Sequence, residues 1–179
     1  MTEKPKAASQ FLLSFWGLPC LLSISVLILD QATKFWVLKY WPVSGKIYQE
    51  VIPGFFSLVH FQNTGAAWGI LSGHTWLLGL ISCLALIAMI VFFRALTESR
   101  LLLSLCYGFL IGGIAGNLYD RLFRQFVVDF LFFYFRDYRY SWPAFNVADM
   151  AITCSVTVMV FYSLFFVKKT KSDSVSEVQ

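Results

Sequence analysis

The chain has few charged residues for its length. Asp, Glu, Lys and Arg make up only 13% of its 179 residues, whereas 58% are hydrophobic. A soluble domain of this size seldom reaches such a composition, so a soluble globular protein is excluded and an integral membrane protein is predicted. The net charge of +4 is modest and gives no case for nucleic-acid binding.

Metal ligands and motifs for covalent catalysis are also scarce. The two histidines, His60 and His74, form no HExxH pattern, and each is interpreted as a lone surface histidine. No GxSxG, Ser-Lys or Cys-His arrangement supplies a nucleophile. The four cysteines form no CxxC pair and lie in apolar windows, so we expect free packing residues buried in the membrane: Cys20, Cys83, Cys106 and Cys154. We therefore predict no metal and no organic cofactor.

Four windows lack charged side chains for long enough to cross a bilayer. At about 1.5 Å per residue, some 18 to 20 helical residues cover the roughly 30 Å of hydrocarbon. The sequence predicts one integral membrane domain over 1–179, with polar tails at 1–10 and 168–179. Its transmembrane helices are expected at about 11–29, 75–93, 101–119 and 150–167.

The first window could instead be a cleaved signal peptide, because Lys4 and Lys6 precede it. Its apolar run is long, however, and ends at Asp30 without a small-x-small cleavage pattern. We interpret it as a permanent helix.

The distribution of cations predicts the orientation. The 14 lysines and arginines divide evenly between the two sides of this arrangement. Those on the side of the termini are concentrated in short segments that flank helices, and such segments weigh most in topogenesis. We expect both termini in the cytoplasm, with segments 35–74 and 120–149 on the opposite side.

Two runs in these extramembrane segments are typical of strands. Residues 55–61 and 126–133 are rich in aromatic and β-branched side chains, and they could pair into a small sheet on the membrane surface. Trp and Tyr residues are concentrated on the same side, either as an aromatic belt at headgroup level or as a platform for a lipid-bearing substrate. Both interpretations can hold together.

Polar residues three or four apart occur at three predicted helix ends. Because that spacing places side chains on one helix face, each set forms a cluster, and all three clusters fall at the same membrane boundary. The sets are Asp30 with Lys34, Asn117 with Asp120 and Arg121, and Asn146 with Asp149. Separate parts of the chain should therefore meet in one layer.

Each cluster also has a structural interpretation. Asp30 and Lys34 could form an interfacial salt bridge, and Asn146 could be an N-cap with Asp149 in the first turn. Asp120 and Arg121 could be ordinary helix-end charges. Asp129 has no such explanation within its Val-Val-Asp-Phe run, and a carboxylate near hydrocarbon rarely lacks a partner or a function.

Gly112 and Gly116 have the small-xxx-small spacing that lets helices pack closely. We expect this packing to bring Asn117 toward the last helix and Asp149.

A pair of carboxylates supports one kind of chemistry. Two close carboxylates share a proton, so the ionised one can take a proton from water while the protonated one polarises a peptide carbonyl. Asp129 and Asp149 are the candidates, and the sequence leaves open which of them holds the proton.

Five ordered blocks of the sequence resemble the motif set of lipoprotein signal peptidase, or signal peptidase II. Each block alone is weak, but together they are specific and cover most of the membrane body. They are LDQATK at 29–34, NTGAA at 63–67, GGIAGNLYDR at 112–121, VDF at 128–130 and PAFNVAD at 143–149. Trp68, where the family commonly has phenylalanine, and the lead-in 140–143 depart from the pattern.

The resemblance implies a fold, a location and an activity. The fold is an all-α polytopic membrane protein with four transmembrane helices and a small extracytoplasmic β-cradle. The location is the bacterial inner membrane, with the active site on the extracytoplasmic side. The activity is that of an aspartyl endopeptidase, expected to be a monomer among membrane lipids, which removes the signal peptide of diacylglyceryl-modified prolipoproteins before the lipidated cysteine.

The resemblance also implies roles for residues. Asp129 and Asp149 would be the catalytic dyad. Gly113, Gly116 and Asp120 would be structural. The remaining matched residues would orient the dyad, shape the pocket or bind substrate: Asp30, Lys34, Asn63, Asn117, Arg121 and Asn146.

Two other functions use the same residues differently. A small proton-coupled transporter also places carboxylates beside Asn and Arg in a membrane, but near the midplane, whereas these cluster at one boundary. A noncatalytic scaffold would use the glycine face for partner helices and would tolerate Asp129→Asn.

Overall fold

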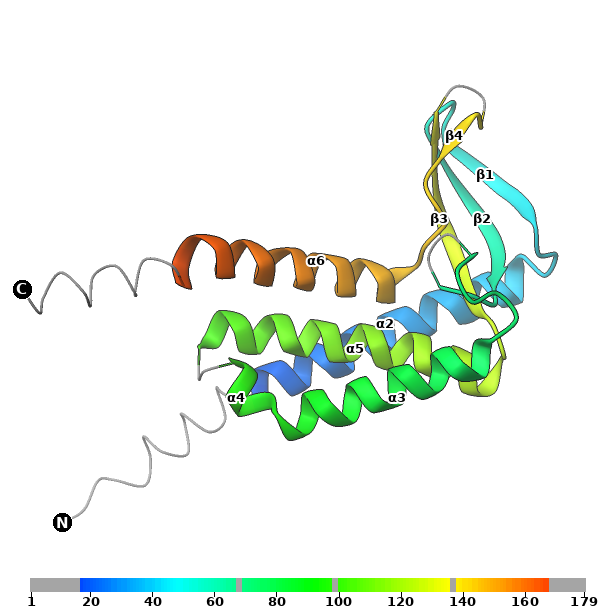
Figure 1. Cartoon of the computed structure of the whole chain (residues 1–179). Helices are drawn as coiled ribbons and strands as arrows, with labels where there is room; N and C mark the ends of the chain where they lie inside the picture. The colour runs from blue at the N-terminus through cyan, green and yellow to red at the C-terminus, as the bar shows by residue number, and fades with distance from the viewer. Residues whose placement is uncertain (1–16, 67–68, 98–99, 136–137, 168–179) are drawn as a thin grey trace, which may run out of the picture.

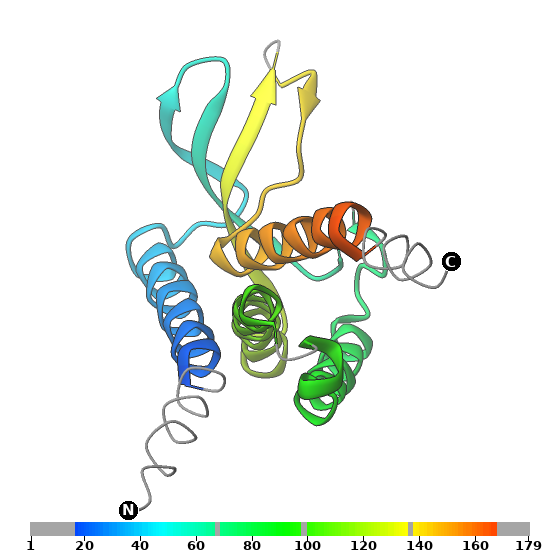
Figure 2. The ribbon, with the colours of Figure 1, turned by 90° about the vertical axis from the view of Figure 1, so that its left-hand side faces the viewer.

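A helical bundle with a small sheet at one end forms the structure, a computed structural model that describes residues 17–66, 69–97, 100–135 and 138–167. The long helices are α2 (Leu18–Tyr40), α3 (Thr75–Val91), α5 (Leu101–Phe123) and α6 (Val147–Tyr162). A short α4 (Phe93–Thr97) follows α3, and a π-helical turn, Ser163–Val167, extends α6. Helix α5 lies at the centre and packs against α2, α3 and α6 (Figure 2). The predicted tails, residues 11–16 and Trp68 lie outside the described residues.

Three of the described helices are long and apolar enough to cross a membrane. They are Leu18–Tyr40, Leu101–Phe123 and Val147–Phe165, and α3, which is more apolar than these, is shorter, with 17 residues. Three helices extend beyond the predicted windows, since α2 continues from 29 to Tyr40, α5 continues from 119 to Phe123, and α6 begins at Val147 rather than at 150. The reason is that the charged residues which end the apolar runs find buried partners, so they need not leave the helix.

The sheet is antiparallel, in the order β1–β2–β3–β4. Its strands are β1 (Lys46–Ile52), β2 (Phe56–Asn63), β3 (Val127–Phe135) and β4 (Tyr140–Ser141). The two predicted strands form and pair, with Phe61 opposite Asp129 and Asn63 opposite Val127. The exposed strand β1 was not predicted. In Figure 1 the sheet stands at the end of the bundle where β3 leaves α5 and where α6 begins.

Glycines on α5 allow close approach on two sides. A Cβ on Gly112 would lie 2.6 Å from the Ser23 carbonyl oxygen of α2, and one on Gly113 would lie 2.6 Å from the Ala148 carbonyl oxygen of α6. Gly116 abuts both neighbours, since its Cβ would lie 2.5 Å from Asp30 Oδ2 of α2 and 3.5 Å from Ala148 Cβ of α6. The predicted approach of Asn117 to Asp149 is confirmed, because Asn117 Nδ2 donates to Asp149 Oδ1 at 2.7 Å.

One smaller expectation is wrong. His60 is buried rather than at the surface, with 1% exposure, because β2 packs it inward and its Nδ1 donates to the Trp41 carbonyl oxygen at 2.7 Å. All four cysteines are free; Cys106 is buried within the protein and the other three are exposed at its surface. Their burial in a membrane stays a prediction.

Candidate active site

Asn146 joins the two aspartates. It is the N-cap of α6, where its Oδ1 accepts the Asp149 backbone N–H at 3.0 Å and the Asp149 Oδ2 accepts the Asn146 backbone N–H at 3.3 Å. This reciprocal capping box fixes Asp149 in the first turn. The Asn146 Nδ2 then donates to Oδ1 of Asp129 on β3, at 2.7 Å. The capping and dyad interpretations of this motif therefore describe one arrangement.

Two further asparagines donate to the dyad in the same way. Asn63 Nδ2 donates to Asp129 Oδ2 at 3.1 Å, and Asn117 Nδ2 donates to Asp149 Oδ1 at 2.7 Å. Their carbonyl oxygens are engaged elsewhere, since Asn63 Oδ1 accepts the Gly65 N–H at 2.9 Å and Asn117 Oδ1 accepts from Lys34 Nζ at 2.8 Å. An amide whose oxygen already has a donor can present only its NH₂ group to the carboxylate. Each asparagine is thus locked in the orientation that the dyad needs.

Lys34 lies behind the dyad and is fully buried. Besides Asn117, its Nζ contacts Asp30 Oδ2 at 2.8 Å and Asp120 Oδ2 at 2.9 Å. An ammonium group has three donors, and these three acceptors use all of them. The sequence pair Asp30–Lys34 is therefore part of a buried network that reaches α5, which an interfacial salt bridge would not do.

The two buried acidic residues of this network hold the backbone next to each catalytic candidate. Asp30 Oδ1 accepts the N–H of Ala148, which precedes Asp149, at 2.9 Å. Asp120 Oδ2 accepts the N–H of Val128, which precedes Asp129, at 3.2 Å. Charges on α2 and α5 therefore fix the positions of both aspartates, although neither Asp30 nor Asp120 lines the pocket described below.

Gln31 and Arg124 complete the network and were not identified from the sequence. Arg124 pairs with Asp120 and donates to Gln31 Oε1 at 2.8 Å, while Gln31 Nε2 donates to Asp30 Oδ2 at 3.0 Å. With Lys34 and Arg124 against Asp30 and Asp120, the formal charges cancel. The available signal was the four-residue spacing of Asp120 and Arg124, which places them on one helix face.

Asp129 and Asp149 differ in exposure. Asp129 is only 3% exposed, whereas Asp149 is half-buried and lines the pocket. Burial, together with the negative charge of Asp149, raises the pKa of Asp129 to about 7, despite the hydrogen bonds from Asn63 and Asn146 that favour its ionised form. A carboxyl group in this environment holds a proton that an ordinary aspartate has lost.

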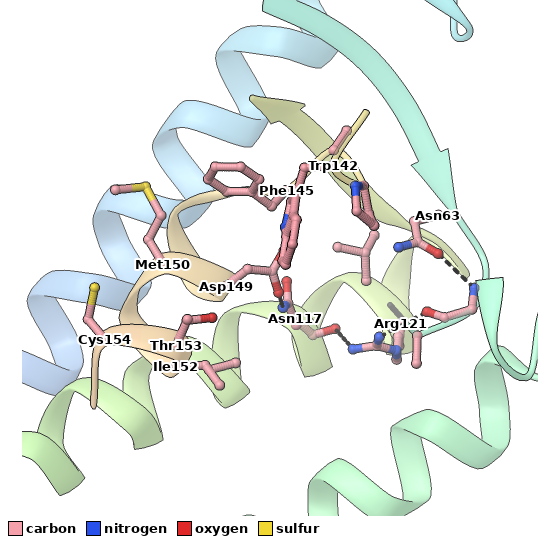
Figure 3. A pocket seen from close by; sticks show the side chains of 15 residues that line it. Asn63, Asn117, Arg121, Trp142, Phe145, Asp149, Met150, Ile152, Thr153 and Cys154 are labelled. Atoms are coloured by element: carbon pink, nitrogen blue, oxygen red, sulfur yellow. Dashed lines mark hydrogen bonds between the residues drawn. The ribbon is translucent and has the colours of Figure 1, made fainter. Parts of the chain in front are cut away.

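A pocket of about 560 Å³ opens beside Asp149. In Figure 3, Asp149 and Asn117 lie between the α6 side chains Met150 and Cys154 on one side and Asn63 and Arg121 on the other. Arg121 is held by the carbonyl oxygens of Asn117 and Gly65, each at 3.3 Å. The pocket therefore has a polar wall at the dyad and an apolar wall along α6. Lining residues that the sequence analysis did not identify include Trp142, Phe145, Met150, Ile152, Thr153 and Cys154.

Within the described ranges, no group of three or more His, Cys, Asp or Glu side chains is arranged to hold a metal ion.

The candidate residues lie in three layers. Asn63, Asn117, Arg121 and Asp149 line the pocket, Asp129 and Asn146 lie directly behind it, and the charged network with Gly113 and Gly116 lies deeper.

Comparison with known proteins gives consistent matches. The family model for signal peptidase (SPase) II matches residues 22–165. A lipoprotein signal peptidase from Anoxybacillus flavithermus is 36% identical over 154 residues, covering 86% of this chain and 89% of that protein. One from Listeria monocytogenes is 38% identical over 151 residues, covering 84% and 96%. Two solved structures, each described as a bacterial membrane enzyme, are 34% identical, with TM-scores of 0.74 and 0.73. They cover 84% and 85% of this chain, and 89% and 96% of the solved chains.

Proposed function

The chain belongs to the signal peptidase II family, and from this premise we propose how its geometry cleaves a lipoprotein precursor. It is an aspartic peptidase of the lipoprotein signal peptidase type, in a membrane body of three to four apolar helices. The observation that carries the mechanism is the Asn146 side chain, which contacts both Asp129 and Asp149 beside a pocket large enough for a peptide segment.

Asp129 and Asp149 are the catalytic residues in this proposal, Asp129 as the general acid and Asp149 as the general base. Asp149, which faces the pocket, is the ionised base that takes a proton from water. The hydroxide adds to the scissile carbonyl carbon, while the protonated Asp129 gives its proton to the carbonyl oxygen. On collapse of the diol, the C–N bond breaks, the leaving nitrogen takes the proton from Asp149, and a diol hydroxyl returns a proton to Asp129. Each carboxyl group ends as it began.

The raised pKa of Asp129 supports this assignment, because a group that keeps its proton near pH 7 suits the acid role. The three asparagines supply positioning. With their oxygens already engaged, by the Lys34 ammonium for Asn117 and by backbone N–H groups for Asn63 and Asn146, the amides cannot turn, and they hold the dyad without competing for its proton.

The substrate class follows from the pocket together with the family. We propose that diacylglyceryl-modified prolipoproteins enter from the membrane along the α6 wall of Met150, Ile152 and Cys154. Three of the α6 lining residues, Met150, Thr153 and Cys154, are exposed on a helix long enough to span, so acyl chains can reach the pocket without leaving the bilayer. Arg121, at the polar wall, would hold the peptide backbone or the lipid ester near the dyad.

The arrangement in the membrane is also a proposal. The single domain 1–179 would span four times, with α3 as the fourth span despite its 17 residues, in the inner membrane of a bacterium. Both termini would be cytoplasmic, segments 35–74 and 120–149 extracytoplasmic, and the working unit a monomer. The sheet and the dyad lie at the same end of the bundle, which agrees with a site at the extracytoplasmic surface (Figure 1).

Replacement of each aspartate by asparagine tests the dyad. Asp129→Asn and Asp149→Asn should each abolish cleavage of a diacylglyceryl-modified precursor by the purified protein, because each removes a proton-transfer group and keeps the shape. Glu50→Gln makes the same carboxylate-to-amide change on the exposed strand β1 and should retain activity. Substantial turnover by either dyad variant, when folded in detergent, would refute the mechanism.

A further inference from the structure

A second hollow lies between α2 and the sheet, and no residue that lines it also lines the active-site pocket. Its volume is about 360 Å³ and nearly all of its lining is apolar. We call it the α2 groove; it is lined by Ala32, Thr33, Trp36, Val37, Trp41, Leu58 and Phe130.

The α2 groove continues the lipid-facing surface of α2. Ile28 and Leu29 lie one turn before Ala32 and Thr33 on the same face, and their side chains are 62% and 56% exposed. Exposed side chains of this kind on a membrane-spanning helix contact acyl chains. The groove is thus open to the hydrocarbon at the end that adjoins Ile28 and Leu29.

The other end of the α2 groove is suited to a headgroup. Trp36 lines it and Tyr40 lies one turn further along α2, and both rings are exposed, as in the aromatic belts of membrane interfaces. Lys39 lies two turns beyond Ala32 on the same side of the helix, with its ammonium 5.3 Å from the centre of the Tyr40 ring. An apolar channel that ends at an aromatic pair and a cation matches a phospholipid in both shape and charge.

We propose that the α2 groove binds one acyl chain of a bilayer phospholipid whose phosphate pairs with Lys39. The occupant is a membrane lipid, because the groove opens on the bilayer side and belongs to a surface separate from the pocket that holds the substrate. The proposal does not depend on the cleavage mechanism.

A bound acyl chain would stabilise β3, the strand that carries Asp129. Val37 and Phe130, in the lining of the groove, pack with Val128 in one buried apolar cluster. Val128 and Phe130 flank Asp129 in β3. An acyl chain in the groove therefore completes the packing on the strand that positions Asp129, and an empty groove leaves that packing open.

Lipid retention measures occupancy directly. The full chain, purified in detergent with added phosphatidylglycerol, is examined by native mass spectrometry, and we expect one retained phosphatidylglycerol per chain. Ala32→Trp fills the groove and should lose this adduct, whereas Ile24→Trp, on the lipid-facing side of the same helix but away from the groove, should keep it. Thr33→Leu is a second filling variant, and the Tm of each variant shows that it is folded.

The headgroup is tested separately. Lys39→Gln should lower phosphatidylglycerol retention at least threefold, and diacylglycerol, which lacks the phosphate, should be retained less than phosphatidylglycerol by the wild type. The proposal fails if the wild type carries only detergent, if the folded groove-filling variants keep as much lipid as Ile24→Trp, or if diacylglycerol binds as well as the phospholipid.

Discussion

Lys34 connects the polar clusters at the ends of α2 and α5. It is fully buried, and its three donors are divided among Asp30, Asp120 and Asn117. A buried charge is tolerated only when its partners neutralise it, and the loss of one partner leaves the others uncompensated. Lys34 is therefore a group that positions the dyad through Asn117, without touching the pocket.

Removal of the Lys34 ammonium should lower the stability of the folded protein. Lys34→Met should lower the free energy of unfolding by about 3 to 5 kcal/mol, because Asp30 and Asp120 would remain buried with less compensating charge. Lys39→Met, on the exposed side of the same helix, should change it by less than about 0.5 kcal/mol in detergent. Unfolding in mixed micelles, followed by tryptophan fluorescence, measures both. Equal stability of the two variants would mean that the network is dispensable.

Asp129 should make both activity and stability depend on pH. Its pKa is raised from 3.8 to about 7 in the folded protein, so between those values the folded state holds a proton that the unfolded state has released. The unfolding free energy must then fall as the pH rises from about 4 to about 7, and this contribution is flat above that range. Activity should fall as the pH rises through about 7, because the acid of the dyad is lost.

The measurements are kcat/KM from pH 5 to 9 and the Tm from pH 4 to 8. The alkaline limb should have an apparent pKa near 7 that belongs to the dyad as a unit. Asp129→Asn should have a smaller decrease in Tm between pH 4 and pH 7 than the wild type. A flat activity profile from pH 6 to 9 would contradict the proton assignment.

Helix packing determines how closely the dyad can be held. Gly113 of α5 faces the Ala148 carbonyl oxygen and the Ile152 side chain of α6, so it sets the distance between α5 and the helix that carries Asp149. Since the contact on the α6 side is partly backbone, an added methyl group cannot be absorbed by a side-chain rotation.

Gly113→Ala should therefore displace the first turn of α6. Its Cβ would lie 2.6 Å from the Ala148 carbonyl oxygen and 2.9 Å from Ile152 Cγ1, which forces a shift. We expect kcat to fall by about tenfold to a hundredfold, as for other small displacements of catalytic groups. Gly79→Ala in α3 is the matched control, since its nearest neighbours lie at 3.8 and 3.9 Å and the change should be tolerated. Full activity of Gly113→Ala would show that α6 can adjust.

Much of this arrangement could be predicted at the level of elements. The apolar windows indicated the helices, and the aromatic runs indicated β2 and β3, because local composition determines both. The first predicted helix ended too early at 29, since Asp30 and Lys34 have the composition of a boundary although their partners are on α5. Strand β1 was missed because its side chains are almost all exposed and carry little apolar pattern.

The candidate site was also predicted only in part, because local sequence indicates which residues lie at helix ends but not which distant residues they contact. The shared layer of Asp129, Asp149 and the asparagines follows from helix ends that alternate in direction. Gln31 could not be identified, because its importance lies in contacts with residues 85 to 93 positions away. Arg124 had a local signal in its spacing from Asp120, but its contact with Gln31 could not be predicted. The apolar wall of Met150 and Cys154 was also missed, since a lipid-facing residue and a pocket residue have the same composition.

At the scale of the whole molecule, the polar groups are gathered at one end. The dyad, the neutral cluster of four charges and the sheet occupy the end of the bundle where α2 and α5 finish and α6 begins. The opposite end carries the α4 turn and Arg100, which contacts Tyr162 of α6. An active site at headgroup depth on one side of a membrane follows if the bundle spans the bilayer along its length.

Cysteine labelling tests which side that is. In a variant whose native cysteines are replaced by alanine, Tyr138→Cys and Leu96→Cys each introduce one thiol, at positions that are 41% and 44% exposed. Position 96 is in α4 and position 138 lies just before β4, and Figure 1 shows these two elements at opposite ends of the molecule. Position 138 belongs to the segment 120–149 that we propose to be extracytoplasmic, and position 96 lies beside Arg94 in the short basic connection for which the positive-inside rule predicts a cytoplasmic location. A membrane-impermeant maleimide added to intact cells, with the outer membrane permeabilised, should label position 138 and leave position 96 unlabelled until the inner membrane is lysed. Labelling of position 96 alone before lysis would reverse the orientation and place the dyad on the cytoplasmic side.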